Sequence, residues 1–212
     1  SSFYPDIRIS ASQQKVMLLD SATIRKISLL QNVEAISMIV EENVHLQNGD
    51  YRTNAVVMGV DDAFTKVSGV AQKVDHGKYE TGTAETPALV LGSGIESALS
   101  LLSDRAVTPV TAYLPKKGAE ATANPLDAIS TINLQPSGSF SIQQDFDNKD
   151  AFTDLGFVKY MLSMSPDEFS AIELKISGNV NDVQKKIRGI LGSHYLVETR
   201  YEQNRSLYAV MQ

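Results

Sequence analysis

Two segments of this sequence, one near each end, share a pattern that switches between extended and helical periodicity. The first covers residues 6–40 and the second residues 171–201. In each segment, short apolar or alternating stretches predict strands, and they flank a stretch with apolar residues at helical spacing. Two such units can pair their strands into one sheet with both helices on one face, the split β-α-β or ferredoxin-like arrangement. The two ends therefore predict an α+β fold.

The helices of both segments have clear start or stop signals. Asp20 or Ser21 can cap the first helix by accepting an N–H bond from its first turn, and Asn179 can cap the second. Gly192 suits the end of the second helix, and residues 194–201 then predict another strand. The apolar residues that define the two helical faces are Ile24, Ile27 and Leu30, and Val180, Val183, Ile187 and Ile190.

The middle of the chain has a different texture, with several short strands and few helices. Residues 153–164 in this part predict a helix. Before it, within the first terminal region, an Asn-Gly pair at residues 48–49 between two extended runs predicts a hairpin. We therefore expect a discontinuous terminal subdomain made of residues 1–62 and 169–212. The inserted β-rich subdomain is expected to cover residues 63–168.

A glycine-rich turn between a strand and a helix raises the question of a nucleotide site. Gly92–Ser97 is close to G-x-G-x-x-G, but Ser97 replaces the third glycine. The region where an acidic residue should meet a ribose, Thr111–Pro115, contains no acid. We interpret the turn as structural, and the sequence predicts no cofactor-binding residues.

No other pattern predicts catalytic or metal-binding residues. The chain has no cysteine, and its three histidines, His45, His76 and His194, lie far apart in sequence. Asp145–Asp150 has the acidity of a calcium loop but lacks the required glycine and glutamate, so we interpret it as a solvated turn. A small enzyme or cofactor binder remains an alternative that a nucleotide thermal-shift screen tests.

Charge and hydropathy narrow the class of protein further. The net charge of −6 argues against a general nucleic-acid binder, which usually carries a basic stripe. No run reaches the roughly 20 apolar residues that a membrane span needs. Since the chain begins with Ser-Ser-Phe-Tyr rather than Met, we expect it to be an excised part of a longer protein.

One loop is a candidate for contact with a partner. Residues 115–125 lie between two predicted strands, are small and polar, and have a proline at each end. They form either a flexible surface hairpin or a projecting element that touches a partner, because exposed loops on rigid scaffolds often carry recognition. The candidate partner-binding residues are Lys116, Lys117, Asn124 and Pro125.

The order of these pieces resembles the extracytoplasmic domain of ABC-transporter permeases. This family includes the lipoprotein-releasing permeases, the macrolide-exporter permease and the cell-division permease, and the similarity is closest to the first of these. The segments that carry the resemblance cover nearly the whole chain in order: Leu30–Ala35, Val56–Asp61, Ala88–Leu102, Val110–Pro115, Phe152–Leu162 and Ala171–Ile176.

The resemblance implies a non-catalytic domain on the periplasmic side of the cell inner membrane. Its ends would form a porter subdomain and its insert a sabre-like subdomain. The parent permease would pair with a second permease subunit and with cytoplasmic ABC ATPase subunits. It would transmit ATP-driven movement to the release or export of a substrate, which in lipoprotein-releasing relatives is a lipoprotein handed to a periplasmic chaperone. The alternatives are an efflux-type domain and a signalling domain that regulates a cell-wall hydrolase.

Overall fold

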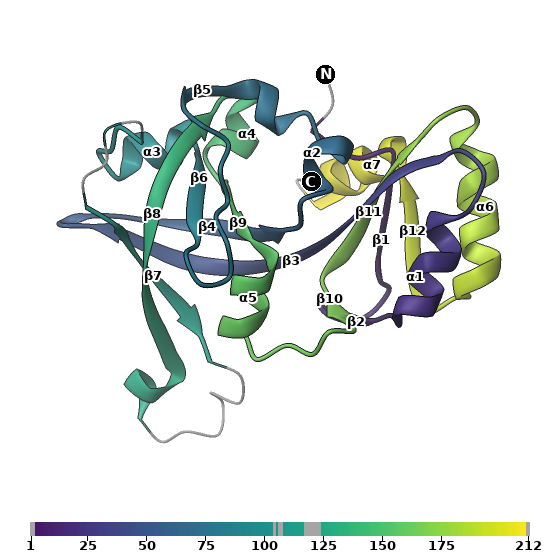
Figure 1. Cartoon of the computed structure of the whole chain (residues 1–212), viewed down its shortest axis with the longest axis horizontal. Helices are drawn as coiled ribbons and strands as arrows, with labels where there is room; N and C mark the ends of the chain where they lie inside the picture. Colours follow the sequence, from purple (N-terminus) through teal and green to yellow (C-terminus); the bar gives the residue numbers. More distant parts are fainter. Residues whose placement is uncertain (1–2, 104, 106–107, 117–123, 211–212) are drawn as a thin grey trace. The chain divides into compact units, whose positions relative to one another are not determined.

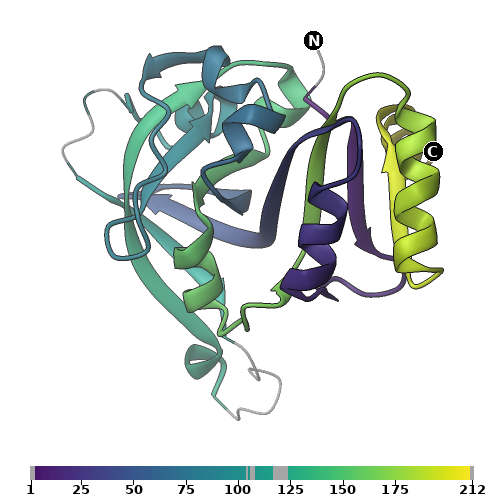
Figure 2. The ribbon, with the colours of Figure 1, turned by 45° about the vertical axis from the view of Figure 1, so that its right-hand side comes forward.

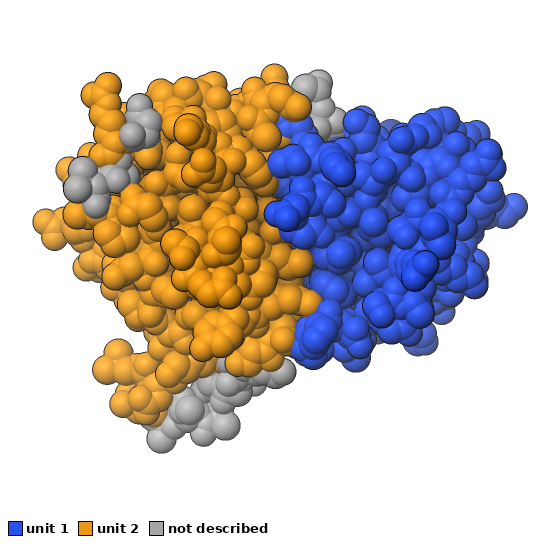
Figure 3. Space-filling view, in the orientation of Figure 1, with its two compact units in different colours: residues 1–39, 61–69, 165–212 blue, residues 40–60, 70–164 orange. Residues whose placement is uncertain are grey.

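The computed structural model describes residues 3–103, 105, 108–116 and 124–210, with only the backbone of residues 206–210 (Figure 1). The chain forms two compact units, which Figure 3 colours separately. Unit 1 comprises Ser1–Ile39, Asp61–Gly69 and Ser165–Gln212, and unit 2 comprises Val40–Val60 and Val70–Met164. Each unit has its own cluster of buried apolar side chains.

Unit 1 is built on a four-stranded antiparallel sheet in the order β12-β1-β11-β3. Its strands are β1 (Ile7–Ala11), the first part of β3 (Val33–Asn48), β11 (Ala171–Ile176) and β12 (Tyr195–Thr199). Two helices, α1 (Ser21–Ser28) and α6 (Val180–Leu191), pack against this sheet (Figure 2). The remaining elements are the paired strands β2 (Met17–Leu18) and β10 (Glu168–Phe169), and the helices α2 (Phe64–Val67) and α7 (Arg200–Val210).

Apolar residues from both ends of the chain meet in the core of unit 1. Ile9 on β1 lies opposite Ile172 on β11 and Val197 on β12. Ile27 of α1 and Ile187 of α6 bury their side chains completely in the same cluster. Each such side chain contributes about 1.5–3 kcal/mol by leaving water. The apolar stripes of the two helices therefore hold both to one sheet.

The predicted caps of both helices are confirmed. The Asp20 carboxylate accepts a hydrogen bond from the backbone N–H of Thr23 at 2.7 Å. The Asn179 side-chain oxygen accepts one from the N–H of Asp182 at 3.2 Å. Gly192 ends α6 with a φ of 80°, a conformation that favours glycine. Local polar groups therefore determine where these helices begin and end.

The prediction of a single strand over residues 194–201 is wrong at its C-terminal end. Strand β12 ends at Thr199, and α7 begins at Arg200. The Thr199 hydroxyl accepts a hydrogen bond from the backbone N–H of Glu202 at 3.4 Å. A threonine that accepts from the first turn in this way is a typical helix start, so the extended pattern stops there.

Unit 2 is a mixed sheet whose pairing closes on itself. Its strands are the second part of β3, β4 (Tyr51–Val60), β5 (Val74–Gly77), β6 (Ala88–Gly92), β7 (Val110–Pro115), β8 (Ile129–Phe140) and β9 (Asp150–Asp154). The order runs β3-β4-β9-β6-β8, and β7 pairs with both β8 and β3, which closes the ring. The helices are η1 (Val70–Lys73), α3 (Ser93–Ala98), η3 (Pro125–Ala128), α4 (Gln144–Asp147) and α5 (Leu155–Met161).

Two predictions in the middle of the chain differ from the structure. Residues 40–60, expected in the terminal subdomain, lie in unit 2 because β3 pairs there with β7 and β4 pairs with β9. Residues 153–164, expected as one helix, begin with the end of β9. Asp154 then caps α5 by accepting the N–H of Phe157 at 2.9 Å, so the helix starts only at Leu155.

The broader prediction of a mixed fold with a sheet-dominated core is confirmed. The predicted turn at residues 48–49 is also confirmed, since Gly49 has a φ of 59° between β3 and β4. Within the described residues, no helix has the length and apolar character needed to cross a membrane.

Candidate functional site

The glycine-rich turn that suggested a nucleotide site is a packing contact between elements of unit 2. A side chain on Gly92 would overlap the backbone of Asp147, and one on Gly94 would overlap Asn148. Asp147 ends α4, and its carboxylate accepts the backbone N–H of Ile142 at 2.8 Å. The space that a phosphate would need in front of the glycines is therefore filled by protein. This supports the structural interpretation of the turn.

The loop singled out in the sequence lies at the end of a hairpin formed by β7 and β8. The two strands pair antiparallel from Val110 opposite Leu134 to Pro115 opposite Ile129. Beyond the last pair, the N–H of Lys116 donates to the carbonyl of Ala128 at 2.8 Å. Figure 1 shows the hairpin extending beyond the other strands of unit 2.

The structure gives each described candidate partner-binding residue a place at this end of the hairpin. Asn124 accepts the N–H of Leu126 at 3.1 Å through its side-chain oxygen and so caps η3. Pro125 is the first residue of η3, a position where its missing N–H costs nothing. Lys116 is exposed, and Lys117 lies outside the described residues. Asn124 and Pro125 therefore also have a local structural role in the turn.

The hairpin presents apolar side chains as well as polar ones. Leu126 is 79% exposed and Ile129 is 44% exposed, whereas Ala112 and Leu114, on the inner side of β7, are buried. The end of the hairpin therefore exposes a leucine and an isoleucine together with Lys116. The composition of the loop alone does not indicate that these side chains are exposed, because their positions depend on the short helix η3, which the sequence analysis does not predict.

A groove of about 920 Å³ lies at the base of the hairpin, within unit 2. Its lining comes from five stretches of the chain: Glu42–His45, Asn54–Val56, Tyr113–Pro115, Ala128–Ile129 and Asn148–Lys149. The strand pairings of β3 with β7 and of β4 with β9 bring these stretches together. No local sequence signal marks the groove, since it depends on pairings between residues far apart in the chain.

Polar side chains in and beside the groove contact one another through hydrogen bonds and ring packing. The His45 Nδ1 atom lies 2.9 Å from the Asn54 side-chain oxygen, and the His45 and Tyr113 rings are 5.9 Å apart. The Tyr113 hydroxyl donates to the Gln47 side chain at 3.3 Å. Among the described residues, no group of three histidine or carboxylate side chains could hold a metal ion. These contacts fix the orientations of the His45 and Tyr113 side chains in the wall of the groove.

A buried carboxylate in unit 2 secures the segment that leads into the hairpin. Glu96 on α3 accepts the backbone N–H of Ser103 at 3.0 Å and lies 3.2 Å from His76 Nδ1. Burial raises the pKa of the Glu96 carboxyl, but hydrogen bonds from Ser103, His76 and Ser139 outweigh burial and leave the pKa below its ordinary value. The ionised form therefore ties α3 to the chain that approaches β7.

Comparisons with known proteins identify the fold. Neither a family model nor a curated sequence matches the chain. The periplasmic region of MacB from Actinobacillus actinomycetemcomitans aligns with 95% of this chain and 92% of its own length, with a TM-score of 0.64 and 12% identity. The extracellular domain of the noncanonic ABC-type transporter YknZ from Gram-positive bacteria aligns with 91% of this chain and 99% of its own length, with a TM-score of 0.62 and 10% identity. This chain has the fold of these extracytoplasmic domains.

Proposed function

We propose that this chain is the extracytoplasmic domain of an ABC-transporter permease. The observation that carries the proposal is a fold shared over nearly the full length of both the chain and two such domains, those of MacB and YknZ. The resemblance of the chain's segments to permease motifs supports the same assignment independently. The domain then belongs to a protein of the cell inner membrane and acts on its outer side.

In this role the domain transmits movement and performs no chemistry of its own. Cytoplasmic ABC ATPase subunits hydrolyse ATP, and the permease pairs with a second permease subunit. Unit 1 corresponds to the porter subdomain, which the order β12-β1-β11-β3 and the packing of α1 and α6 support. Unit 2 corresponds to the sabre-like insert, which the closed ring of strands supports.

The finer proposal is lipoprotein release, with the β7–β8 hairpin contacting a periplasmic chaperone. The exposed Leu126 and Ile129 provide apolar contact area, and Lys116 and Lys117 provide positive charge for an acidic partner surface. An efflux-type permease is the second candidate. The description of YknZ as an ABC-type transporter favours transport over the regulation of a cell-wall hydrolase.

Charge reversal at the hairpin tests the finer proposal. The double variant Lys116→Glu/Lys117→Glu should reduce chaperone recovery in a pull-down with the domain. The matched control is Lys185→Glu/Lys186→Glu, which reverses two adjacent exposed lysines on α6. If the hairpin variant recovers as much chaperone as the wild type, the hairpin is not the contact.

The broader proposal has a separate test. The full-length permease should co-purify with an ABC ATPase subunit, and ATP hydrolysis by the complex should be measurable in membrane vesicles. Failure to find an ATPase partner would contradict the permease assignment, whatever the hairpin binds.

A further inference from the structure

The first turn of α7 begins with a reciprocal hydrogen-bonded pair. The Thr199 hydroxyl accepts the N–H of Glu202 at 3.4 Å and donates to the Glu202 carboxylate at 3.1 Å. The spacing T-x-x-E is that of a capping box, here with the hydroxyl rather than the backbone of the threonine facing the carboxylate. These two hydrogen bonds fix the position of the Glu202 carboxylate at the start of α7, where side chains from other elements also contact it.

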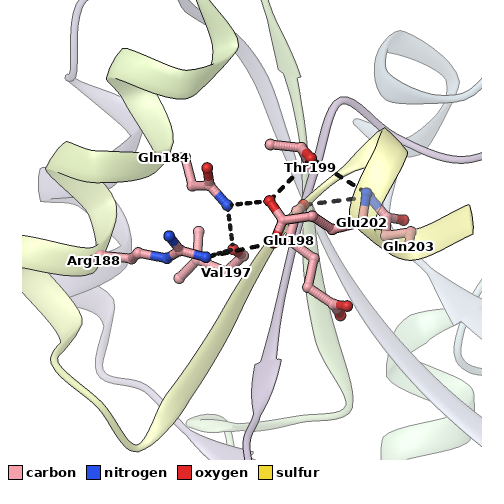
Figure 4. A network of polar contacts seen from close by, with 7 residues as sticks. All are labelled: Gln184, Arg188, Val197, Glu198, Thr199, Glu202 and Gln203. Carbon is pink, nitrogen blue, oxygen red and sulfur yellow. Dashed lines mark hydrogen bonds and ion pairs between the residues drawn. The ribbon is translucent and has the colours of Figure 1, made fainter. Parts of the chain in front are cut away.

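Helix α6 reaches this carboxylate from one side. Gln184, which is buried, donates from Nε2 to the Glu202 carboxylate at 2.7 Å and to the carbonyl of Val197 at 2.8 Å. An Arg188 guanidinium nitrogen donates to the same carbonyl at 3.2 Å and lies 3.6 Å from the carboxylate. Figure 4 shows these side chains converging on the end of β12 and the start of α7. The turn is therefore bound to α6.

The same turn holds the segment that precedes β1. Arg200 donates from its backbone N–H to the carbonyl of Asp6 at 3.2 Å, and its guanidinium donates to the Asp6 carboxylate at 2.8 Å and to the carbonyl of Tyr4 at 3.2 Å. Gln203, only 6% exposed, donates from Nε2 to the carbonyl of Pro5 at 3.2 Å. The second oxygen of Asp6 accepts the N–H of Ile176 at 2.8 Å, which extends the network to β11.

We propose that Thr199–Gln203 form a mechanical joint, in which the first turn of α7 fastens the start of β1 and the side of α6 into one body. The role of this joint in transmission rests on the proposed function. In a permease domain that transmits movement, the movement enters through the segments at its two ends. A displacement of α7 then reaches β1 and α6 together. Without the joint, α7 could shift or fray without moving the sheet.

The contacts of the joint differ in strength, and this difference selects the variants. The Arg200–Asp6 pair is partly exposed, with 47% and 21% of the two side chains accessible, so solvent weakens it. Gln203 is buried, and removal of its amide leaves the carbonyl of Pro5 without that donor. Gln203→Met keeps the length of the side chain and removes the donor, so it is the primary variant. Arg200→Gln is the second.

Hydrogen–deuterium exchange of this chain tests whether the joint couples its parts. In Gln203→Met, amide exchange should rise about tenfold in residues 200–204 and also in β1, and in Arg200→Gln about threefold in both. The control Tyr201→Gln changes a residue in the same turn that is 74% exposed, and it should alter neither segment. A rise confined to α7, with β1 as protected as in the wild type, would overturn the proposal.

A transport assay on the full-length permease with its ATPase partner tests whether the joint transmits movement. Gln203→Met should preserve ATP hydrolysis and lower the amount of substrate released per ATP by several-fold, whereas Tyr201→Gln should keep the wild-type ratio. An unchanged ratio alongside coupled exchange would overturn the role in transmission. If the parent protein shows no ATP-driven activity, the proposed function fails instead, and the exchange result still decides whether the joint exists.

Discussion

Replacing Glu96 with glutamine should destabilise the protein at neutral pH by an amount that disappears in acid. A hydrogen bond to an ionised partner contributes about 1.5–3 kcal/mol, and a neutral one about 1 kcal/mol. The bond from the Ser103 N–H is buried, whereas half of the His76 side chain is exposed and adds little. Because glutamine keeps an acceptor but loses the charge, we expect a loss of about 1–2 kcal/mol at pH 7.

The sign of the pH dependence follows from the lowered pKa of Glu96. A carboxyl whose pKa is lower in the folded than in the unfolded protein stabilises the fold at pH values above its unfolded pKa, here 4.5. This contribution is lost as the pH falls through the pKa of the folded protein. The difference between wild type and Glu96→Gln in urea unfolding, followed by circular dichroism, should therefore shrink between pH 5 and the acid limit. A difference that stays the same from pH 7 to pH 3 would refute the reasoning.

Two controls isolate the carboxylate. Glu85→Gln changes an exposed glutamate of the same unit and should leave the unfolding midpoint unchanged at every pH. The comparison repeated in a His76→Asn background removes the imidazole that lies beside Glu96. If the pH dependence vanishes in that background, the imidazole rather than the Ser103 bond is its source.

Two further substitutions test the packing and the caps. Gly92→Ala should lower the free energy of unfolding by about 1–3 kcal/mol through overlap with Asp147, while Gly189→Ala, in a helix with open space around it, should raise it by about 0.5–1 kcal/mol. Equal thermal stability of the two variants would contradict the packing role of Gly92. Asp154→Ala should cost about 1 kcal/mol by removing the cap of α5; thermal unfolding that matches the wild type would show that the cap contributes nothing.

The ends of the chain were more predictable than the middle because their signals are local. Asp20 and Asn179 cap helices within three residues of themselves, so the relevant contact is visible in the sequence. The start of α7 was equally local, in the T-x-x-E spacing of Thr199 and Glu202, but the alternating residues before it were extended two positions too far. The T-x-x-E cap ends the extended backbone at Thr199, although the alternation of residues alone predicts that the strand continues to residue 201.

The groove and the closed ring of unit 2 could not be predicted from local signals. The pairing of His45 with Tyr113 joins β3 to β7, and that of Val56 with Asp150 joins β4 to β9. The gain from each pairing depends on the others being in place, because closing these long loops costs conformational entropy before any contact forms. The hairpin loop was visible as a composition, but the surface around Leu126 and the groove beneath it exist only once the ring has closed.

The glycine-rich turn shows how one sequence pattern serves two physical purposes. Glycine permits close approach to any group, whether a phosphate oxygen or a neighbouring peptide. At Gly92 and Gly94 the neighbours are Asp147 and Asn148 at the end of α4, a segment more than 50 residues away in sequence. The Asp147 carboxylate in turn binds the backbone at Ile142, so the contact fixes the turn between β8 and β9. The two glycines thus let β6 and α3 pack directly against α4. Gly92 lies opposite Phe140, whereas the loop of the β7–β8 hairpin leaves β8 at its other end, next to Ile129.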